Sequence, residues 1–300
     1  MKTLIKKMTR ALLALIVAVS GLALTRSHVS AAPVTIGLCA SDGTITMPDL
    51  TVVPVWGFVL TGSCASGLVN DTNFPGPVLD VNEGDVVTIN LANALPGGHT
   101  SSFELPGLPV TMVAAGQYEF TASRPGTFVY QSDGDAGRQM AMGLYGALIV
   151  RSATPGAYGT ASTGYDVEAT LVLSQVDPNF NAAPDTFDMN NYLATYWLIN
   201  GKAYPGTAPV AATAGQRLLL RYVNAGYDNT TMMLLGMHEE VLARDAYLLN
   251  NSFFANAETI PAGGTEDAIA TVPSSAPPVA AGFALYNRQL HDGMMTFIQP

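Results

Sequence analysis

The stretch FPGPVLDVNEGDVVTINLANAL, residues 74–95, decides the fold because its pattern occurs twice in the chain. An aromatic-Pro-Gly turn precedes a Gly, which starts a strand of alternating apolar residues that ends on an Asn nine residues later. The segments YPG, residues 204–206, and GQRLLLRYVN, residues 215–224, repeat this order about 130 residues further on. Two copies of one unit favour two similar domains in tandem over one large sheet.

Short apolar runs separated by turns continue this pattern through the chain. Pro-Gly, Asn-Gly and Gly-Gly pairs mark the turns, and no long helical period is present. The runs are residues 86–91, 126–130, 144–150, 169–173, 218–223, 283–286 and 294–298. Short strands at this spacing are typical of all-β sandwiches, so we predict an all-β fold.

The domain boundaries follow from the repeat. We expect one β-sandwich domain over residues 32–151 and a second over residues 165–300. Residues 152–164, SATPGAYGTASTG, have the small and turn-forming composition of a linker between them.

The first 31 residues are organised like a secretory signal peptide. Four basic residues precede an apolar core over residues 11–24, and Val29-Ser30-Ala31 fits the small-x-small cleavage pattern. The core is shorter than the ~20 residues of a membrane span, so we expect cleavage before Ala32; an uncleaved anchor is the alternative. We therefore predict a secreted, periplasmic or cell-surface protein with no membrane span after cleavage.

The charge of the mature chain argues against anionic partners. Five of the 13 Lys and Arg residues lie in residues 1–31, which contain no Asp or Glu. The remaining 8 basic residues stand against 23 acidic ones, a net charge of −15. Such a surface repels nucleic acid and anionic lipid, and no basic cluster is present to seat phosphates.

The two cysteines, Cys39 and Cys64, predict a disulfide because the leader indicates an oxidising compartment. Closing a loop of this size stabilises a fold by ~3 kcal/mol in the chain-entropy model. The alternative is a thiolate that binds copper or zinc, but neither Cys has a His within ten residues.

Five segments, in order along the chain, carry a family resemblance. They are LCASDGTITMPDLTVVPVWGF (38–58), FPGPVLDVNEGDVVTINLANAL (74–95), RPGTFVYQSDGDAGRQMAMGLYGALIV (124–150), YWLINGKAYPG (196–206) with AGQRLLLRYVNAG (214–226), and LYNRQLHDGMMTFI (285–298). Together they resemble the multicopper oxidase family, laccase-like and of bacterial type, which is built from cupredoxin domains. The resemblance implies two tandem cupredoxin-like Greek-key β-sandwiches.

The copper ligands of that family are missing from the matching positions. The family has His-x-His-Gly where this chain has Glu104-Leu105-Pro106-Gly107, and Tyr-His-Ser-His where it has Tyr130-Gln131-Ser132-Asp133. We therefore interpret Glu104, Pro106, Gln131 and Asp133 as degenerate ligand positions. No Cys follows Cys64, so the thiolate of a type 1 copper has no counterpart.

The histidines that remain are weak candidates for metal ligands. The mature chain has three, His99, His238 and His291, whereas the family's full copper set uses about ten. His238 precedes two glutamates, but on a strand it shares a face with only the second of them. Residues 131–135 are rich in side-chain oxygens. One interpretation of them is a site for a hard cation such as Ca²⁺, and the other is a solvated turn without a ligand.

From these residues we predict a non-catalytic binding or structural module outside the cytoplasm. We expect no cofactor and an unidentified protein or surface partner; a homo-oligomer also stays open. The alternative is a copper-binding oxidoreductase of the same family with reduced or unusual metal content, because thioether and imidazole groups can also bind copper.

Overall fold

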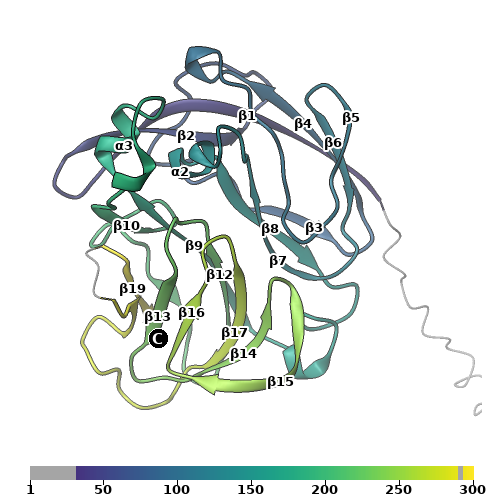
Figure 1. The fold of residues 1–300 in the computed structure, drawn as a ribbon. Coiled ribbons are helices and arrows are strands. Elements are labelled where there is room, and N and C mark those ends of the chain that lie inside the picture. The colour runs from purple at the N-terminus through teal and green to yellow at the C-terminus, as the bar shows by residue number, and fades with distance from the viewer. Residues whose placement is uncertain (1–31, 290–292) are drawn as a thin grey trace, which may run out of the picture.

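Strands dominate the computed structural model, which describes residues 32–289 and 293–300 (Figure 1). Residues 32–151 are termed the N-terminal half, and residues 165–300 the C-terminal half. The N-terminal half has a sheet with the order β2 (Val52–Leu60), β1 (Pro33–Thr46), β4 (Val86–Asn93), β6 (Gln117–Thr121) and β5 (Thr111–Ala114). Its second sheet has the order β3 (Leu79–Asn82), β8 (Tyr145–Arg151) and β7 (Gly126–Gln131).

The C-terminal half also has two sheets. The larger has the order β10 (Tyr196–Ile199), β9 (Val167–Val176), β12 (Arg217–Asn224), β17 (Thr265–Thr271), β14 (Glu239–Arg244) and β15 (Tyr247–Ala255). The smaller has the order β11 (Val210–Ala211), β19 (Met295–Gln299), β18 (Phe283–Asn287), β13 (Thr230–Leu234) and β16 (Ala257–Ile260). In each half the chain passes repeatedly from one sheet to the other, and the predicted all-β fold class is confirmed.

The two copies of the sequence repeat occupy matching places. Strand β4 pairs in parallel with β1, and β12 pairs in parallel with β9. The closing strands match as well, since β8 lies parallel to β3 and β19 lies parallel to β11. The turns that precede the copies also agree, because Phe74-Pro75 and Tyr204-Pro205 are both cis peptides.

Alternating apolar residues build the core of each half. On β4, Val87, Ile89 and Leu91 are buried while the residues between them face outward or are half-buried. They pack in one cluster with Phe128 and Leu148 from the opposite sheet. Burial of each such side chain contributes ~1.5–3 kcal/mol, which is why a period of two residues fixes the strand's orientation.

The two halves share a buried seam, which positions the candidate site. A third apolar cluster joins Phe74 and Tyr145 of the N-terminal half to Val172 and Leu198 of the C-terminal half. In Figure 1 the short helix α3 (Pro178–Ala182) of the C-terminal half lies beside β2 of the other half. Within the contact, the Asn181 side chain donates to the Pro54 carbonyl at 2.8 Å.

The N-terminal end of β1 is held by an acidic side chain. The backbone N of Ala32 donates to Asp85 Oδ1 at 3.1 Å, and Asp85 is almost fully buried. Asp85 Oδ2 accepts from the backbone N of Asn82 at 2.8 Å. From this anchor, β1 runs beside β4 from Pro33 onward.

The predicted disulfide between Cys39 and Cys64 is confirmed. The predicted linker, residues 152–164, runs from β8 to β9 and contains the short 3-10 helix η2 (Ala161–Thr163), with Ala157 buried against the C-terminal half. Over residues 32–289 and 293–300, no helix is long and apolar enough to cross a membrane. The predicted signal peptide, residues 1–31, lies outside the described residues.

Candidate functional site

Two of the four residues predicted to occupy degenerate ligand positions lie side by side. Glu104 forms an isolated antiparallel bridge with Gln131, the last residue of β7. The backbone N of Glu104 donates to the Gln131 carbonyl at 2.8 Å, and the reverse bond is 3.0 Å long. The structure therefore joins the two segments that the sequence matched to ligand-bearing segments of the multicopper oxidases.

The third position, Asp133, lies close to Glu104. Burial raises the pKa of Glu104, and the hydrogen bond and charge of the Asp133 carboxyl raise it further. The hydroxyl of Ser102 donates to Asp133 Oδ1 at 3.2 Å. Pro106, the fourth position, has neither a side-chain donor nor an acceptor, so the set offers two carboxyls and one amide where imidazoles would be needed for copper.

A hydrogen-bond network anchored on Gln139 holds this loop. The buried Ser132 hydroxyl donates to Gln139 Oε1 at 2.6 Å. Gln139 Nε2 donates to the Thr100 carbonyl at 2.8 Å and to Asp135 Oδ2 at 3.0 Å. The loop contains the solvated turn that the sequence predicted, but the short helix α2 (Arg138–Met142), which was not predicted, follows it before the next strand and carries Gln139.

Replacing Gln139 with Leu is expected to lower the free energy of unfolding by about 1–3 kcal/mol, because buried partners lose their hydrogen bonds. Urea denaturation at pH 7 measures the loss. Gln117→Leu is the control, since Gln117 donates to Asn90 at an exposed site and should cost less than about 0.5 kcal/mol. Equal losses in both variants would contradict the role of the network.

The candidate histidines do not converge on one another. His99 lies between two carboxylates, with Nδ1 2.8 Å from Asp135 Oδ2 and Nε2 3.0 Å from Asp185 Oδ1. Its ring centroid is 4.8 Å from that of Trp56. These contacts occupy both ring nitrogens and link the His99 loop to the segment that follows α3.

His238 is exposed and directly precedes strand β14. The neighbouring Glu239 is buried and Glu240 is half-buried, so His238 and Glu240 face outward as the strand period predicts. His291 lies outside the described residues. Within the part of the chain that the structure describes, no group of three or more His, Cys, Asp or Glu side chains could hold a metal ion.

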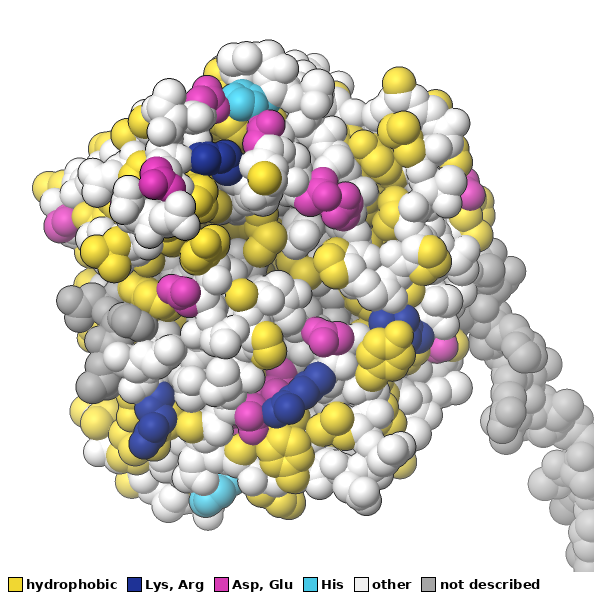
Figure 2. Space-filling model, in the orientation of Figure 1, with side chains coloured by type: hydrophobic (Ala, Val, Ile, Leu, Met, Phe, Trp, Pro, Cys, Tyr) yellow, Lys and Arg dark blue, Asp and Glu magenta, His cyan; other side chains and the backbone are white. Residues whose placement is uncertain are grey.

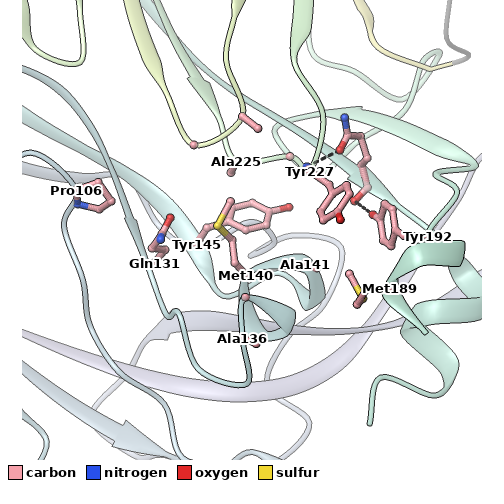
Figure 3. A pocket seen from close by; sticks show the side chains of 15 residues that line it. Pro106, Gln131, Ala136, Met140, Ala141, Tyr145, Met189, Tyr192, Ala225 and Tyr227 are labelled. Atoms are coloured by element: carbon pink, nitrogen blue, oxygen red, sulfur yellow. Dashed lines mark hydrogen bonds between the residues drawn. The ribbon is translucent and has the colours of Figure 1, made fainter. Parts of the chain in front are cut away.

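A cavity of about 360 Å³ lies at the seam of the two halves, directly beside the degenerate positions (Figure 3). Pro106 and Gln131 line one side of it. The other lining residues are Ala136, Gly137, Met140, Ala141, Tyr145, Gln175, Met189, Tyr192, Ala225, Gly226, Tyr227, Ala262 and Gly263. The cavity thus combines tyrosines and methionines with a few amide groups.

Gln175 organises the C-terminal side of the cavity. Its Oε1 accepts from the backbone N of Tyr227 at 2.6 Å and from that of Asp228 at 3.2 Å. Its Nε2 is buried, without a hydrogen-bond partner among the described residues. These bonds fix the backbone that carries Tyr227, whose ring lies 5.0 Å, centroid to centroid, from that of Tyr192.

Sequence reasoning missed the C-terminal side of this cavity. Gln175, Tyr192 and Tyr227 stand far apart in the chain and belong to no motif. They meet Tyr145 and Gln131 only because the two halves pack together. The Tyr-Gln-Ser-Asp segment was the available signal for the N-terminal side, and it did identify Gln131.

Comparisons with known proteins agree with this architecture. A multicopper oxidase family profile matches residues 58–155. The copper-containing nitrite reductase of Alcaligenes xylosoxydans xylosoxydans is 28% identical over 242 residues, which is 70% of this chain and 72% of the reductase. The match thus extends over both halves.

Solved structures match the fold over most of the chain. The multicopper oxidase mgLAC superposes with a TM-score of 0.74 at 19% identity, covering 90% of this chain and 86% of that protein. The blue copper oxidase from Nitrosomonas europaea gives a TM-score of 0.73 at 19% identity, with 89% and 86% covered. The repeat, the sheets and these likenesses agree on a cupredoxin-like fold, and the stretch from residue 58 to residue 155 resembles the multicopper oxidases.

Proposed function

We propose that this protein is an exported, non-catalytic binding protein that keeps the multicopper oxidase framework without its copper chemistry. The observation that carries the proposal is the set of side chains at the matched ligand positions, which are Glu104, Pro106, Gln131 and Asp133. Copper oxidases need imidazole and thiolate donors that bind the metal in both oxidation states. These four side chains supply neither.

The fit of copper to the rest of the chain is equally poor. Both cysteines are engaged in the disulfide, so no thiolate is free for a type 1 centre. His99 holds two carboxylates through its two ring nitrogens, and His238 faces outward from a different part of the C-terminal half. We therefore assign no step of the function to copper. The cavity at Gln131 supports binding as the remaining role of the site.

Export is supported by the N-terminal sequence and by the disulfide, which forms in oxidising compartments. Intact-mass measurement of the protein recovered outside the cytoplasm tests the expected cleavage before Ala32. Recovery of the uncleaved chain in the cytoplasm would contradict export and would leave the assignment of the cavity untouched.

Copper loading tests the non-catalytic role. Residues 32–300 are incubated with Cu(II) or with Cu(I) under reducing conditions, desalted and analysed by mass spectrometry for metal per chain. We expect far less than one copper per chain and no oxygen uptake with a phenolic substrate, because the donors do not fit. Stoichiometric copper together with oxygen uptake would favour the copper-dependent oxidoreductase instead.

A variant that restores imidazoles provides the matched control for this experiment. The chain with Glu104→His, Pro106→His, Gln131→His and Asp133→His presents the family's ligand residues on the same framework. Copper retention by this variant and not by the parent would show that the side chains, rather than a failure of loading, exclude the metal.

A further inference from the structure

The large side chains that line the cavity beside Gln131 are mostly tyrosines and methionines, set among alanines and glycines. Tyr145 is buried at its base, whereas Tyr227 is 55% exposed. Figure 3 shows Met140 against the Tyr145 ring, with Tyr192 and Tyr227 side by side on the opposite wall. A volume of about 360 Å³ is at the small end of the range for ligand pockets, which is ~300–1,000 Å³. The occupant it fits is therefore a compact molecule with an apolar body.

The cavity wall is uncharged, and carboxyl groups lie near it. None of the lining residues is Lys, Arg, Asp or Glu. Tyr192 is buried enough to raise its pKa, and the neighbouring carboxylates of Asp177 and Asp228 contribute to the rise. On the other side, the carboxyls of Glu104 and Asp133 adjoin Gln131. Carboxylates therefore lie near the cavity in both halves.

One arginine follows the cavity lining in the sequence. Arg138, which follows the lining residue Gly137, donates through Nη1 to the carbonyl oxygens of Pro184 at 2.7 Å and Phe187 at 2.9 Å. Figure 2 shows hydrophobic side chains across the middle of this face, with both acidic and basic side chains above and below them. An anionic ligand would find no cationic partner on the cavity wall.

We propose that the cavity beside Gln131 binds a small organic cation, an aromatic or alkyl ammonium, whose charged head contacts the tyrosine rings. The faces of tyrosine rings attract ammonium groups within about 6 Å of their centroids. The surrounding carboxylates and the strongly acidic mature chain raise the local concentration of cations. This inference rests on the proposed binding role and names the ligand class of that same site.

Three probes with one aromatic body and different charges test the ligand class. Benzyltrimethylammonium, benzyl alcohol and benzoate are titrated calorimetrically into residues 32–300 at pH 7 and low ionic strength. We expect the cation to bind about tenfold more tightly than the neutral alcohol, and benzoate to bind least. The preference should shrink as salt is added, because the carboxylates that create it are partly exposed.

Two substitutions locate the binding. Tyr227→Leu keeps an apolar side chain but removes the ring, and is expected to weaken binding of the cation about 2- to 30-fold. Tyr247→Leu is the matched control, since Tyr247 is 61% exposed on β15 and does not line the cavity. Asp228→Asn is expected to lower the affinity for the cation and to leave the affinity for benzyl alcohol unchanged. Circular dichroism confirms that each variant is folded.

Each other outcome overturns the inference in a recognisable way. Tighter binding of benzyl alcohol would assign the site to a neutral hydrogen-bonding ligand that engages the free Gln175 amide. An unchanged affinity in Tyr227→Leu would place the cation elsewhere. No binding of any probe by copper-free protein would overturn the organic-cation site alone, whereas stoichiometric copper would overturn the proposed function itself.

Discussion

Replacing Arg221 with Met is expected to lower the free energy of unfolding by about 3–5 kcal/mol, because it leaves the buried carboxylate of Asp267 without its cation. Arg221 and Asp267 are each 1% exposed, and Nη1 of the arginine lies 3.2 Å from Oδ2 of the aspartate. Arg221 Nε is also 3.2 Å from Glu168 Oε2. Burial alone lowers the pKa of Arg221, but Asp267 and Glu168 raise it overall, so the guanidinium stays charged.

The same network fastens the two halves together. Thr127 of β7 donates to Asp267 Oδ1 at 2.6 Å and accepts from Arg221 Nη1 at 3.0 Å. Tyr158, from the segment between the halves, donates to Asp267 Oδ2 at 2.5 Å. Loss of Arg221 therefore affects the seam as well as the C-terminal half.

Urea denaturation of three variants measures the effect of Arg221. Arg217→Met on the same strand is the control, because Arg217 is only half-buried and donates to the exposed Ser162 carbonyl; we expect it to cost less than about 1 kcal/mol. The double variant Arg221→Met/Asp267→Asn should recover part of the loss, since it removes the orphaned charge. Similar losses for Arg221→Met and Arg217→Met would show that the buried pair contributes nothing.

Two buried glutamates are expected to make the protein less stable as the pH rises. Burial raises the pKa of Glu266 to about 8, although its contact with Arg244 lowers it in part. Burial likewise raises the pKa of Glu239 to about 7, against the hydrogen bond from Tyr222, with the charge of Glu258 adding to the rise. Both carboxyls lie between the sheets of the C-terminal half, and one oxygen of each lacks a hydrogen-bond partner among the described residues.

The direction of the effect follows from proton linkage. A carboxyl whose pKa is raised on folding binds its proton more tightly in the folded state, so the stabilisation is complete below the unfolded pKa of 4.5. It is lost as the pH rises through about 7 for Glu239 and about 8 for Glu266. We expect the free energy of unfolding to fall by roughly 6 kcal/mol between pH 5 and pH 9, at about 1.4 kcal/mol per pKa unit.

Conservative amide variants test this assignment. Glu266→Gln and Glu239→Gln carry no charge, so each should flatten the fall in stability and make the protein more stable than the parent at pH 9. Glu240→Gln, on the outer face of the same strand β14, should keep the parent's pH dependence. A free energy of unfolding of the unsubstituted protein that stays constant from pH 5 to pH 9 would contradict the prediction.

The strands of the repeat could be predicted from the sequence because each is fixed by local signals. Strands β4 and β12 both start after a Gly turn and formed where expected; β4 alternates buried and exposed residues, whereas β12 is buried along almost its whole length. The short helices could not be predicted in the same way. Helix α2 follows Gly137 and has no side-chain cap, and five residues are too few to show a helical period. Helix α3 did have a signal, since Asp177 caps it ahead of Pro178.

The candidate site could be predicted only on its N-terminal side. Glu104 and Gln131 were identified because the family pattern marks their positions. The tyrosine wall depends on how the halves pack, and no local pattern around Tyr192 or Tyr227 encodes that packing. The hydrogen bonds of Gln139 could not be predicted either, because they depend on the direction in which helix α2 points the side chain of its second residue.

The contact between Ala32 and Asp85 would give cleavage of the predicted signal peptide an effect on stability. In the unprocessed chain the group that reaches Asp85 Oδ1 is a neutral peptide amide. Cleavage after Ala31 would turn the same nitrogen into a charged ammonium, which adds the attraction of opposite charges to its contact with the Asp85 carboxyl. Cleavage would thereby strengthen the contact that anchors the start of β1, so that this strand would be more stable in the mature chain than in the precursor.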